Sequence, residues 1–250
     1  SAVWAQTDLD AKRLADVGAP VRGVLGNLKF DSVPDGPLLA RGRAWRDTSA
    51  RPVVLFASSR EGEEAAWLAS WQRARDNFER TQQSVQWLLV PRHPQRFDEV
   101  IALCTGAGLS VSRRSDWSDR PEPADVWLGD SMGEMAQYYG MAHAAMLGGS
   151  FEPLGGQNLI EALSCDCPVV MGPHTFNFSE ASDLAADARV ALRVADMDAG
   201  VKEAVRLVNE PARWADLVSR CHLFTNAHRG AALSTALAVV QQLRTSPPTE

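Results

Sequence analysis

From residue 51 onward, short apolar runs alternate with segments of helical periodicity, and this alternation limits the possible fold more than any other feature. Apolar runs at 52–57, 85–90, 126–130, 144–147, 168–171 and 190–194 predict strands, and a weaker run at 109–111 predicts one more. Segments 61–80, 95–107, 132–139, 157–164 and 179–187 predict helices, and further helices extend to about residue 244. Apolar strands separated by helices are typical of a parallel sheet covered on both faces. We therefore expect an α/β fold with a Rossmann-like, doubly wound parallel sheet.

The first 50 residues follow a different pattern. Residues 3–5 and 21–25 predict short strands, residues 8–17 predict a helix, and residues 31–37 are rich in turn formers, as in a linker. We predict that residues 1–33 are the tail of a preceding domain with its linker, and that residues 34–250 form the later domain. The opening residues resemble neither a signal peptide nor a start, so we expect a longer parent protein.

Charge and cysteine content argue against several classes of function. The chain has 31 acidic and 25 basic residues and a net charge of −6, whereas a nucleic-acid-binding or anionic-membrane surface needs a basic face. The four cysteines form no C-x-x-C pair, and we expect free thiols. No apolar run approaches the ~20 residues that span a bilayer.

Ligands of doubly wound sheets bind beyond the carboxyl ends of the strands, so the residues that follow each predicted strand are candidates. Arg60 follows the first of these strands, where Ser58 or Ser59 with Glu63 or Glu64 can form a helix capping box. A later strand ends in Pro-Arg-His-Pro at 91–94, where two prolines stiffen the loop and arginine suits phosphate.

Two further loops contain glycine. The turn at 129–134 lets a ligand approach the backbone, although Asp130 is also a candidate helix N-cap. The loop at 148–156 holds four glycines and leads into a helix predicted from residue 157, whose first amides favour a phosphate. Glu161 on that helix can accept hydrogen bonds from a ribose diol. We interpret this region as a nucleotide-sugar site, the alternative being a mobile connection with a capping glutamate.

Taken in order, these segments resemble the Kdo transferase family of lipopolysaccharide synthesis. The matching segments are G-N-L-K-F-D at 26–31, E-G-E-E at 61–64, P-R-H-P at 91–94, G-D-S-M-G-E at 129–134, G-G-S-F at 148–151, G-G-Q-N-L-I-E at 155–161 and G-P-H-T-F-N-F at 172–178. Each segment alone is weak, and the ordered set is specific. Two positions depart from the family pattern, because many members have His in place of Gln157 and Thr-His in place of Ser59-Arg60.

The resemblance implies a two-domain GT-B fold in which the carboxy-terminal domain holds most of CMP-Kdo. The implied CMP contacts are Pro91, Arg92, Met132, Gly133, Glu134, Asn158, Leu159, Ile160 and Glu161. The resemblance also implies that Lys29 stabilises the transition state. We expect Arg60, Gly155, Gly156, Gln157 and His174 to line the donor site.

Members of the family transfer Kdo from CMP-Kdo to a lipid A precursor with inversion, at the cytoplasmic face of the bacterial inner membrane. The resemblance implies that the general base, the acceptor groove and the membrane association belong to the amino-terminal domain. We therefore predict that this chain binds CMP but does not transfer sugar by itself. We expect no cofactor and no metal, because the D-x-D patterns at 8–10 and 196–198 fall where helices begin and suit helix caps.

Three other classes of protein are alternatives to a Kdo transferase. A different GT-B enzyme that uses a UDP-sugar, either an epimerase or a transferase, shares the glycine loop and the helix-borne glutamate. A non-catalytic nucleotide-binding module is disfavoured because Lys29, Arg92 and Glu161 are all present. An NAD-dependent oxidoreductase is disfavoured because G-x-G-x-x-G is missing.

Overall fold

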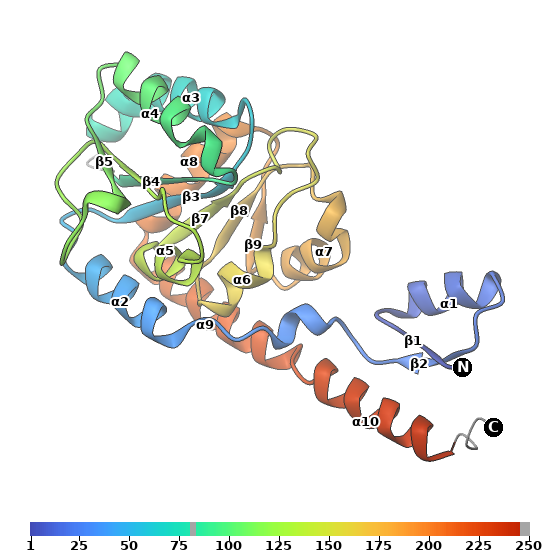
Figure 1. Ribbon diagram of the computed structural model, residues 1–250. Coiled ribbons are helices and arrows are strands. Elements are labelled where there is room, and N and C mark those ends of the chain that lie inside the picture. Colours follow the sequence, from blue (N-terminus) through green and yellow to red (C-terminus); the bar gives the residue numbers. More distant parts are fainter. Residues whose placement is uncertain (81–83, 246–250) are drawn as a thin grey trace. The chain divides into compact units, whose positions relative to one another are not determined.

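The computed structural model describes residues 1–80 and 84–245, and the chain divides into two compact units (Figure 1). The larger unit is Pro34–His222, and the smaller unit combines Ser1–Val33 with Leu223–Glu250. The last segment of the chain thus groups with the first, whereas its sequence position had assigned it to the later domain.

The larger unit contains a seven-stranded, all-parallel sheet with the order β5-β6-β4-β3-β7-β8-β9. The strands are β3 (Val53–Ser59), β4 (Gln86–Pro91), β5 (Val111–Arg113), β6 (Val126–Leu128), β7 (Ala144–Leu147), β8 (Val169–Met171) and β9 (Ala191–Arg193). In the centre of the sheet, Phe56 pairs with Leu89 and Met146, and all three side chains are fully buried. The expected doubly wound parallel sheet is confirmed.

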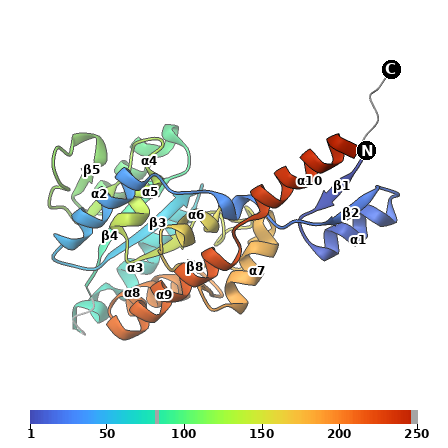
Figure 2. The same ribbon diagram turned by 90° about the horizontal axis from the view of Figure 1, so that it is seen from below.

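Helices cover both faces of this sheet, as Figures 1 and 2 show. The helices α3 (Glu63–Arg80), α4 (Phe97–Gly106) and α8 (Met197–Val208) lie on one face, and α5 (Met135–Met141) and α6 (Leu159–Ser164) lie on the other. The helix α2 (Gly36–Asp47) packs on α5. The helix α7 (Ser179–Asp187) follows β8, and α9 (Pro211–Ala227) follows α8. Trp67 of α3 is fully buried against Trp87 of β4, with 5.3 Å between ring centroids.

Several element boundaries differ from the sequence prediction. The sequence prediction has no helix at α2, because the turn formers at 31–37 are also typical of a linker. Asp35 is in fact its N-cap and accepts a hydrogen bond from Leu38 N at 2.9 Å, with a proline in the first turn. The weak strand expected at 109–111 lies at Val111–Arg113 instead. α5 begins at Met135 rather than 132, because Gly133 adopts a positive φ of 78° in a turn.

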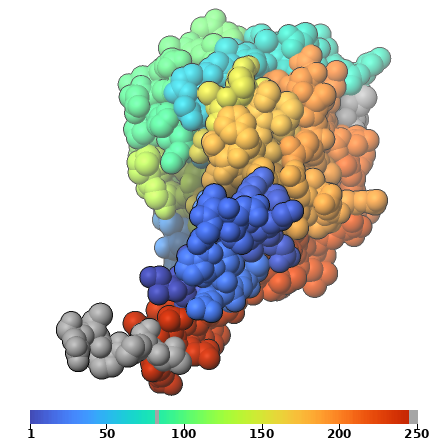
Figure 3. All heavy atoms as spheres, turned by 90° about the vertical axis from the view of Figure 1, so that its right-hand side faces the viewer, coloured from blue at the N-terminus to red at the C-terminus, as the bar shows by residue number. Residues whose placement is uncertain are grey.

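The smaller unit contains the parallel pair β1 (Val3–Ala5) and β2 (Val21–Val24), with the helices α1 (Asp8–Asp16) and α10 (Ala231–Thr245). Figure 3 shows the blue amino-terminal segment lying against the red carboxy-terminal one. Asp31 ends the short 3-10 turn η1 (Leu28–Asp31), and its carboxylate accepts hydrogen bonds from Gly230 N at 2.6 Å and Ala232 N at 2.7 Å. This contact joins residues 199 positions apart.

Candidate functional site

The chain order reverses at β3, because β4 lies on one side of it and β7 on the other. Doubly wound sheets bind ligands at such a switch point, outside the carboxyl ends of the strands. The predicted site residues of the larger unit all follow or end five neighbouring strands at this edge. They are Arg60 after β3, Pro91 and Arg92 at the end of β4, Met132, Gly133 and Glu134 after β6, Gly155 to Glu161 after β7, and His174 after β8.

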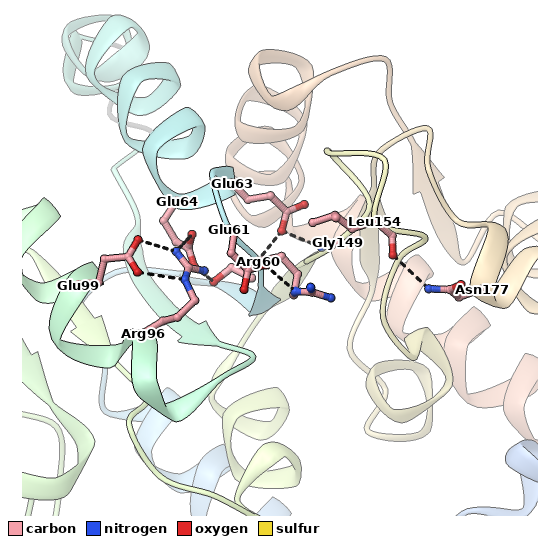
Figure 4. Close-up of polar contacts among 10 residues, drawn as sticks. Arg60, Glu61, Glu63, Glu64, Arg96, Glu99, Gly149, Leu154 and Asn177 are labelled. Carbon is pink, nitrogen blue, oxygen red and sulfur yellow. Dashed lines mark hydrogen bonds and ion pairs between the residues drawn. The ribbon is translucent and has the colours of Figure 1, made fainter.

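A buried carboxylate anchors the glycine loop after β7 (Figure 4). The Oε2 atom of Glu63 accepts hydrogen bonds from Arg60 N at 2.8 Å and Gly149 N at 2.7 Å, and its Oε1 atom accepts one from Phe151 N at 3.1 Å. The side chain has no solvent exposure, and this burial raises the pKa of Glu63 although the three backbone donors oppose the rise. The sequence indicates Glu63 as part of a capping box and of the family-like segment 61–64, but not as a contact of the glycine loop.

Three of the predicted lining residues, Arg60, Gly156 and Gln157, meet around Gly149. Its φ of 69° is left-handed, and a Cβ atom built there would lie 3.3 Å from Gln157 Nε2 and 3.6 Å from Arg60 Cγ. A Cβ atom on Gly156 would lie 3.3 Å from the carbonyl oxygen of His174. The loops after β3, β7 and β8 therefore converge, as their shared position at the sheet edge predicts.

Further along the same loop, Gly155 packs against Asn177. The Asn177 side chain donates a hydrogen bond from Nδ2 to the Leu154 carbonyl at 3.1 Å (Figure 4). This bond ties the glycine loop to the segment after β8.

Two arginines with different surroundings follow β4, Arg92 in the Pro-Arg-His-Pro loop and Arg96 at the end of the 3-10 turn η2 (Pro94–Arg96). Arg92 donates its backbone N–H to the Ser59 carbonyl at 2.9 Å, and its exposed guanidinium makes no hydrogen bond or ion pair within the described part of the chain. Arg96 is buried and binds Glu64 with two hydrogen bonds of 2.8 and 3.0 Å (Figure 4). The buried pair holds the base of the loop, and Arg92 projects from it into solvent.

The turn after β6 is also held by arginines. The Oε1 atom of Glu134 accepts hydrogen bonds from Arg41 and Arg114, both at 2.9 Å, so its carboxylate links α5 to α2. Asp130, a candidate helix N-cap in the sequence, does not cap α5, whose N-cap position is Glu134. Its carboxylate accepts hydrogen bonds from Arg113 Nε and Ser115 N, both at 2.8 Å. Arg41 and Arg114 lie on segments for which the sequence carried no site motif. In the same turn after β6, Met132 is 65% exposed.

At the start of α6, the side chains divide between core and solvent. Asn158 is the N-cap and accepts a hydrogen bond from Ile160 N at 3.1 Å, so one amide expected to face a phosphate is already bonded. Leu159 and Ile160 are buried in the core, whereas Glu161 is exposed. Leu159 and Ile160 are therefore limited to backbone contacts with any ligand.

Lys29 belongs to the smaller unit. It lies on η1, whose N-cap Asn27 accepts a hydrogen bond from Lys29 N at 3.0 Å. The next residue, Phe30, is buried with its ring 5.7 Å from that of Phe224 and 4.9 Å from that of His228. The lysine is thus carried by a turn that is anchored on both sides.

The two D-x-D patterns take part in helix capping. Asp196 caps α8 and accepts a hydrogen bond from Ala199 N at 2.8 Å, while Asp10 pairs with the cap Thr7 of α1. Within the described residues, no group of three or more His, Cys, Asp or Glu side chains is arranged to hold a metal ion. The four cysteines are free and buried. No helix in the described ranges is long and apolar enough to cross a membrane.

No family model matches the chain. The 3-deoxy-D-manno-octulosonic acid transferase of Bordetella pertussis is 45% identical over 234 residues, which are 93% of this chain and 54% of that protein. Among solved structures, the C-terminal CMP-Kdo binding domain of WaaA from Acinetobacter baumannii matches 76% of this chain and 98% of that one, with 29% identity and a TM-score of 0.68. A glycosyltransferase from Rickettsia africae matches 99% of this chain and 64% of that one, with a TM-score of 0.60 at 12% identity, which indicates a shared fold.

The sheet, the helices on both faces and these structural relatives define the carboxy-terminal domain of a GT-B glycosyltransferase. Within that class, the chain belongs to the 3-deoxy-D-manno-octulosonic acid (Kdo) transferase family. It spans about half the length of the curated relatives that it matches.

Proposed function

We propose that this chain is the donor-binding half of an enzyme that transfers Kdo from CMP-Kdo to a lipid A precursor. The observation that carries the proposal is that Arg60, Arg92, Gln157 and Glu161 all follow the carboxyl ends of three adjacent strands, β3, β4 and β7, with Arg60 and Gln157 meeting around Gly149. The 45% identity to a named Kdo transferase supports the choice of donor among the nucleotide sugars.

The exposed groups at this edge suit the parts of CMP. The guanidinium of Arg92, with no partner in the described part of the chain, is free to bind the phosphate through paired charge-assisted hydrogen bonds. The exposed carboxylate of Glu161 accepts hydrogen bonds from the ribose hydroxyls. Pro91, Met132, Gly133, Asn158, Leu159 and Ile160 supply backbone and apolar contacts. The carboxylate of Glu134 is held by two arginines, so we propose that it shapes the turn that contacts the base.

The proposed reaction inverts the anomeric carbon. A base takes the proton of an acceptor hydroxyl, that oxygen bonds to the anomeric carbon, and the bond to the CMP phosphate breaks. Negative charge then grows on the departing phosphate, and preorganised cationic donors lower the barrier, each by about 3 kcal/mol. We assign this task to Arg92, with Arg60, Gly155, Gly156, Gln157 and His174 lining the donor site. The transition-state role that the resemblance implies for Lys29 stays a prediction.

We assign the remaining functions to the half of the relatives that this chain does not span. These functions are the general base, the acceptor groove and association with the cytoplasmic face of the bacterial inner membrane. In this scheme, residues 1–33 are the tail of the acceptor-binding domain with its linker, and residues 34–250 belong to the donor-binding domain, although the last of them, residues 223–250, group with residues 1–33 in one compact unit.

Calorimetric titration of the purified chain with CMP tests the proposal, with UMP and NAD as competitors of different class. We expect selective CMP binding that Glu161→Ala weakens about tenfold, because the substitution removes a charged carboxylate that accepts hydrogen bonds from the ligand. Glu122→Ala, in the loop that precedes β6 at the other edge of the sheet, is the matched control and should bind CMP like the wild type.

The other outcomes separate the alternatives. Preference for UMP would assign the chain to a UDP-sugar enzyme, and binding of NAD alone would overturn the glycosyltransferase assignment. Equal CMP affinity of the Glu161→Ala variant and the wild type would overturn the proposed role of this glutamate.

A further inference from the structure

Two adjacent carboxylates at the start of α3, Glu63 and Glu64, are almost completely buried, with 0% and 1% exposure. Figure 4 shows that they point to opposite sides, Glu64 toward Arg96 and Glu63 toward the glycine loop. Burying a carboxylate is costly unless hydrogen bonds satisfy it. Glu64 accepts hydrogen bonds from the Arg96 guanidinium and from the Ser59 hydroxyl, the latter at 2.7 Å. Within the described residues, Glu63 instead accepts hydrogen bonds from backbone N–H groups alone.

The donors to Glu63 come from two loops that flank the switch point. Arg60 N belongs to the turn between β3 and α3, and the N–H groups of Gly149 and Phe151 belong to the loop after β7. One side chain therefore links two segments that lie 86 residues apart in the sequence. The two loop amides bind the protein's own carboxylate, so they are not offered to an anionic ligand.

The groups that remain available at this point are side chains. Arg60 and Gln157 meet over Gly149, whose amide is held by Glu63. The Nε atom of Arg60 donates a hydrogen bond to the carboxylate of Glu61 at 2.9 Å, so the terminal nitrogens of its guanidinium are the ones that remain for a ligand. We infer that Glu63 is a positioning residue of the donor site, which sets the separation of the two loops so that Arg60 and Gln157 receive the donor's phosphate. This inference rests on the proposed function.

The inference differs from a purely structural role in what it predicts for ligands with and without a phosphate. If Glu63 positions Arg60 and Gln157, its loss weakens binding of CMP and leaves binding of cytidine unchanged. If Glu63 only supports the fold, its loss weakens both ligands together.

The test uses Glu63→Gln, which keeps the size of the side chain but replaces one accepting oxygen with an NH₂ group. That group cannot accept from a backbone N–H, so at least one of the three hydrogen bonds is lost. We expect about tenfold weaker CMP binding by calorimetry, unchanged cytidine binding by NMR titration, and faster hydrogen exchange at Gly149 or Phe151. Glu79→Gln, near the other end of α3 and 64% exposed, is the matched control and should change none of these.

Glu63→Asp serves as a second variant in case Glu63→Gln does not fold. It keeps the charge but is one methylene shorter, so it cannot hold both loops at their present separation and should also weaken CMP selectively. Equal CMP affinity of the wild type and a folded Glu63 variant, or parallel loss of CMP and cytidine, overturns the inference. A wild-type chain that fails to bind CMP overturns the proposed function itself, and the donor role of Glu63 falls with it.

Discussion

At the scale of single residues, the surroundings of a side chain decide whether it is available for a ligand. Arg92 and Arg96 lie four positions apart between β4 and α4, yet the side chain of Arg92 is exposed without a partner in the described chain and that of Arg96 is buried against Glu64. Burial by itself lowers the pKa of Arg96. The hydrogen bonds to Glu64 and Glu99 outweigh this effect, so the pKa is raised above its usual value. Arg96 is therefore a fixed structural cation, and Arg92 is the candidate ligand-binding one.

This difference leads to a prediction for Arg92→Ala. We expect the free energy of unfolding to change by less than about 0.5 kcal/mol, because the guanidinium makes no hydrogen bond or ion pair with a described group. We expect CMP to bind at least about tenfold more weakly, because the phosphate loses a charged donor. Denaturant unfolding and calorimetric titration measure the two quantities. Arg206→Ala is the control, because Arg206 is 54% exposed and, among the residues that the structure describes, pairs only with Glu203 on α8. Unchanged CMP affinity of Arg92→Ala would count against the phosphate assignment.

At the scale of elements, the starts of strands and helices are held by specific caps and contacts. His143 immediately precedes β7, and its Nδ1 atom accepts a hydrogen bond from Val53 N at 3.1 Å. Its carbonyl accepts another from Trp214 Nε1 at 2.7 Å. Burial, with a smaller contribution from Arg46, lowers the pKa of His143 to about 4. The neutral ring is thus a structural acceptor that joins β7 to β3.

The lowered pKa of His143 predicts a pH dependence of stability. The unfolded chain takes up a proton near pH 6.5 and the folded chain only near pH 4, so the free energy of unfolding falls as the pH drops between these values. The contribution is up to about 3 kcal/mol. We expect this fall to be smaller in His143→Gln, whose amide oxygen can accept from Val53 N without titrating. Parallel stability profiles for the two proteins, from denaturant unfolding at each pH, would contradict the role assigned to His143.

At the scale of the whole molecule, the proposed donor-binding residues that follow strands β3, β4, β6, β7 and β8 lie within Pro34–His222, whereas Lys29 lies in the smaller unit. The chain spans about half the length of its curated relatives. In the proposed scheme, the base and the acceptor groove belong to the other half. Binding of the donor and transfer of the sugar are then separable properties.

We therefore predict that the 250-residue chain binds CMP but transfers no Kdo from CMP-Kdo to a lipid A precursor. The absence of a base to activate the acceptor hydroxyl is the physical reason. A coupled transfer assay, with a full-length relative as the positive control, measures this. Turnover by the isolated chain would show that all catalytic groups are contained in it.

The sequence by itself determined the α/β class and most of the strands and helices, and it predicts the edge of the sheet at which we propose the site. Apolar periodicity and turn residues are local signals, and in a parallel sheet the ends of neighbouring strands meet by topology. Even α2 left a local signal in Asp35-Gly36-Pro37, although the same residues also suit a linker.

Only the tertiary structure decided which polar groups of that edge are already used. Glu63 binds amides of the glycine loop 86 residues away, and Glu134 binds Arg41 93 residues away. The grouping of residues 223–250 with residues 1–33 likewise depends on contacts such as that of Asp31 with Gly230. Burial and pairing depend on neighbours in space, and residues so far apart in the chain leave no local pattern that would reveal them.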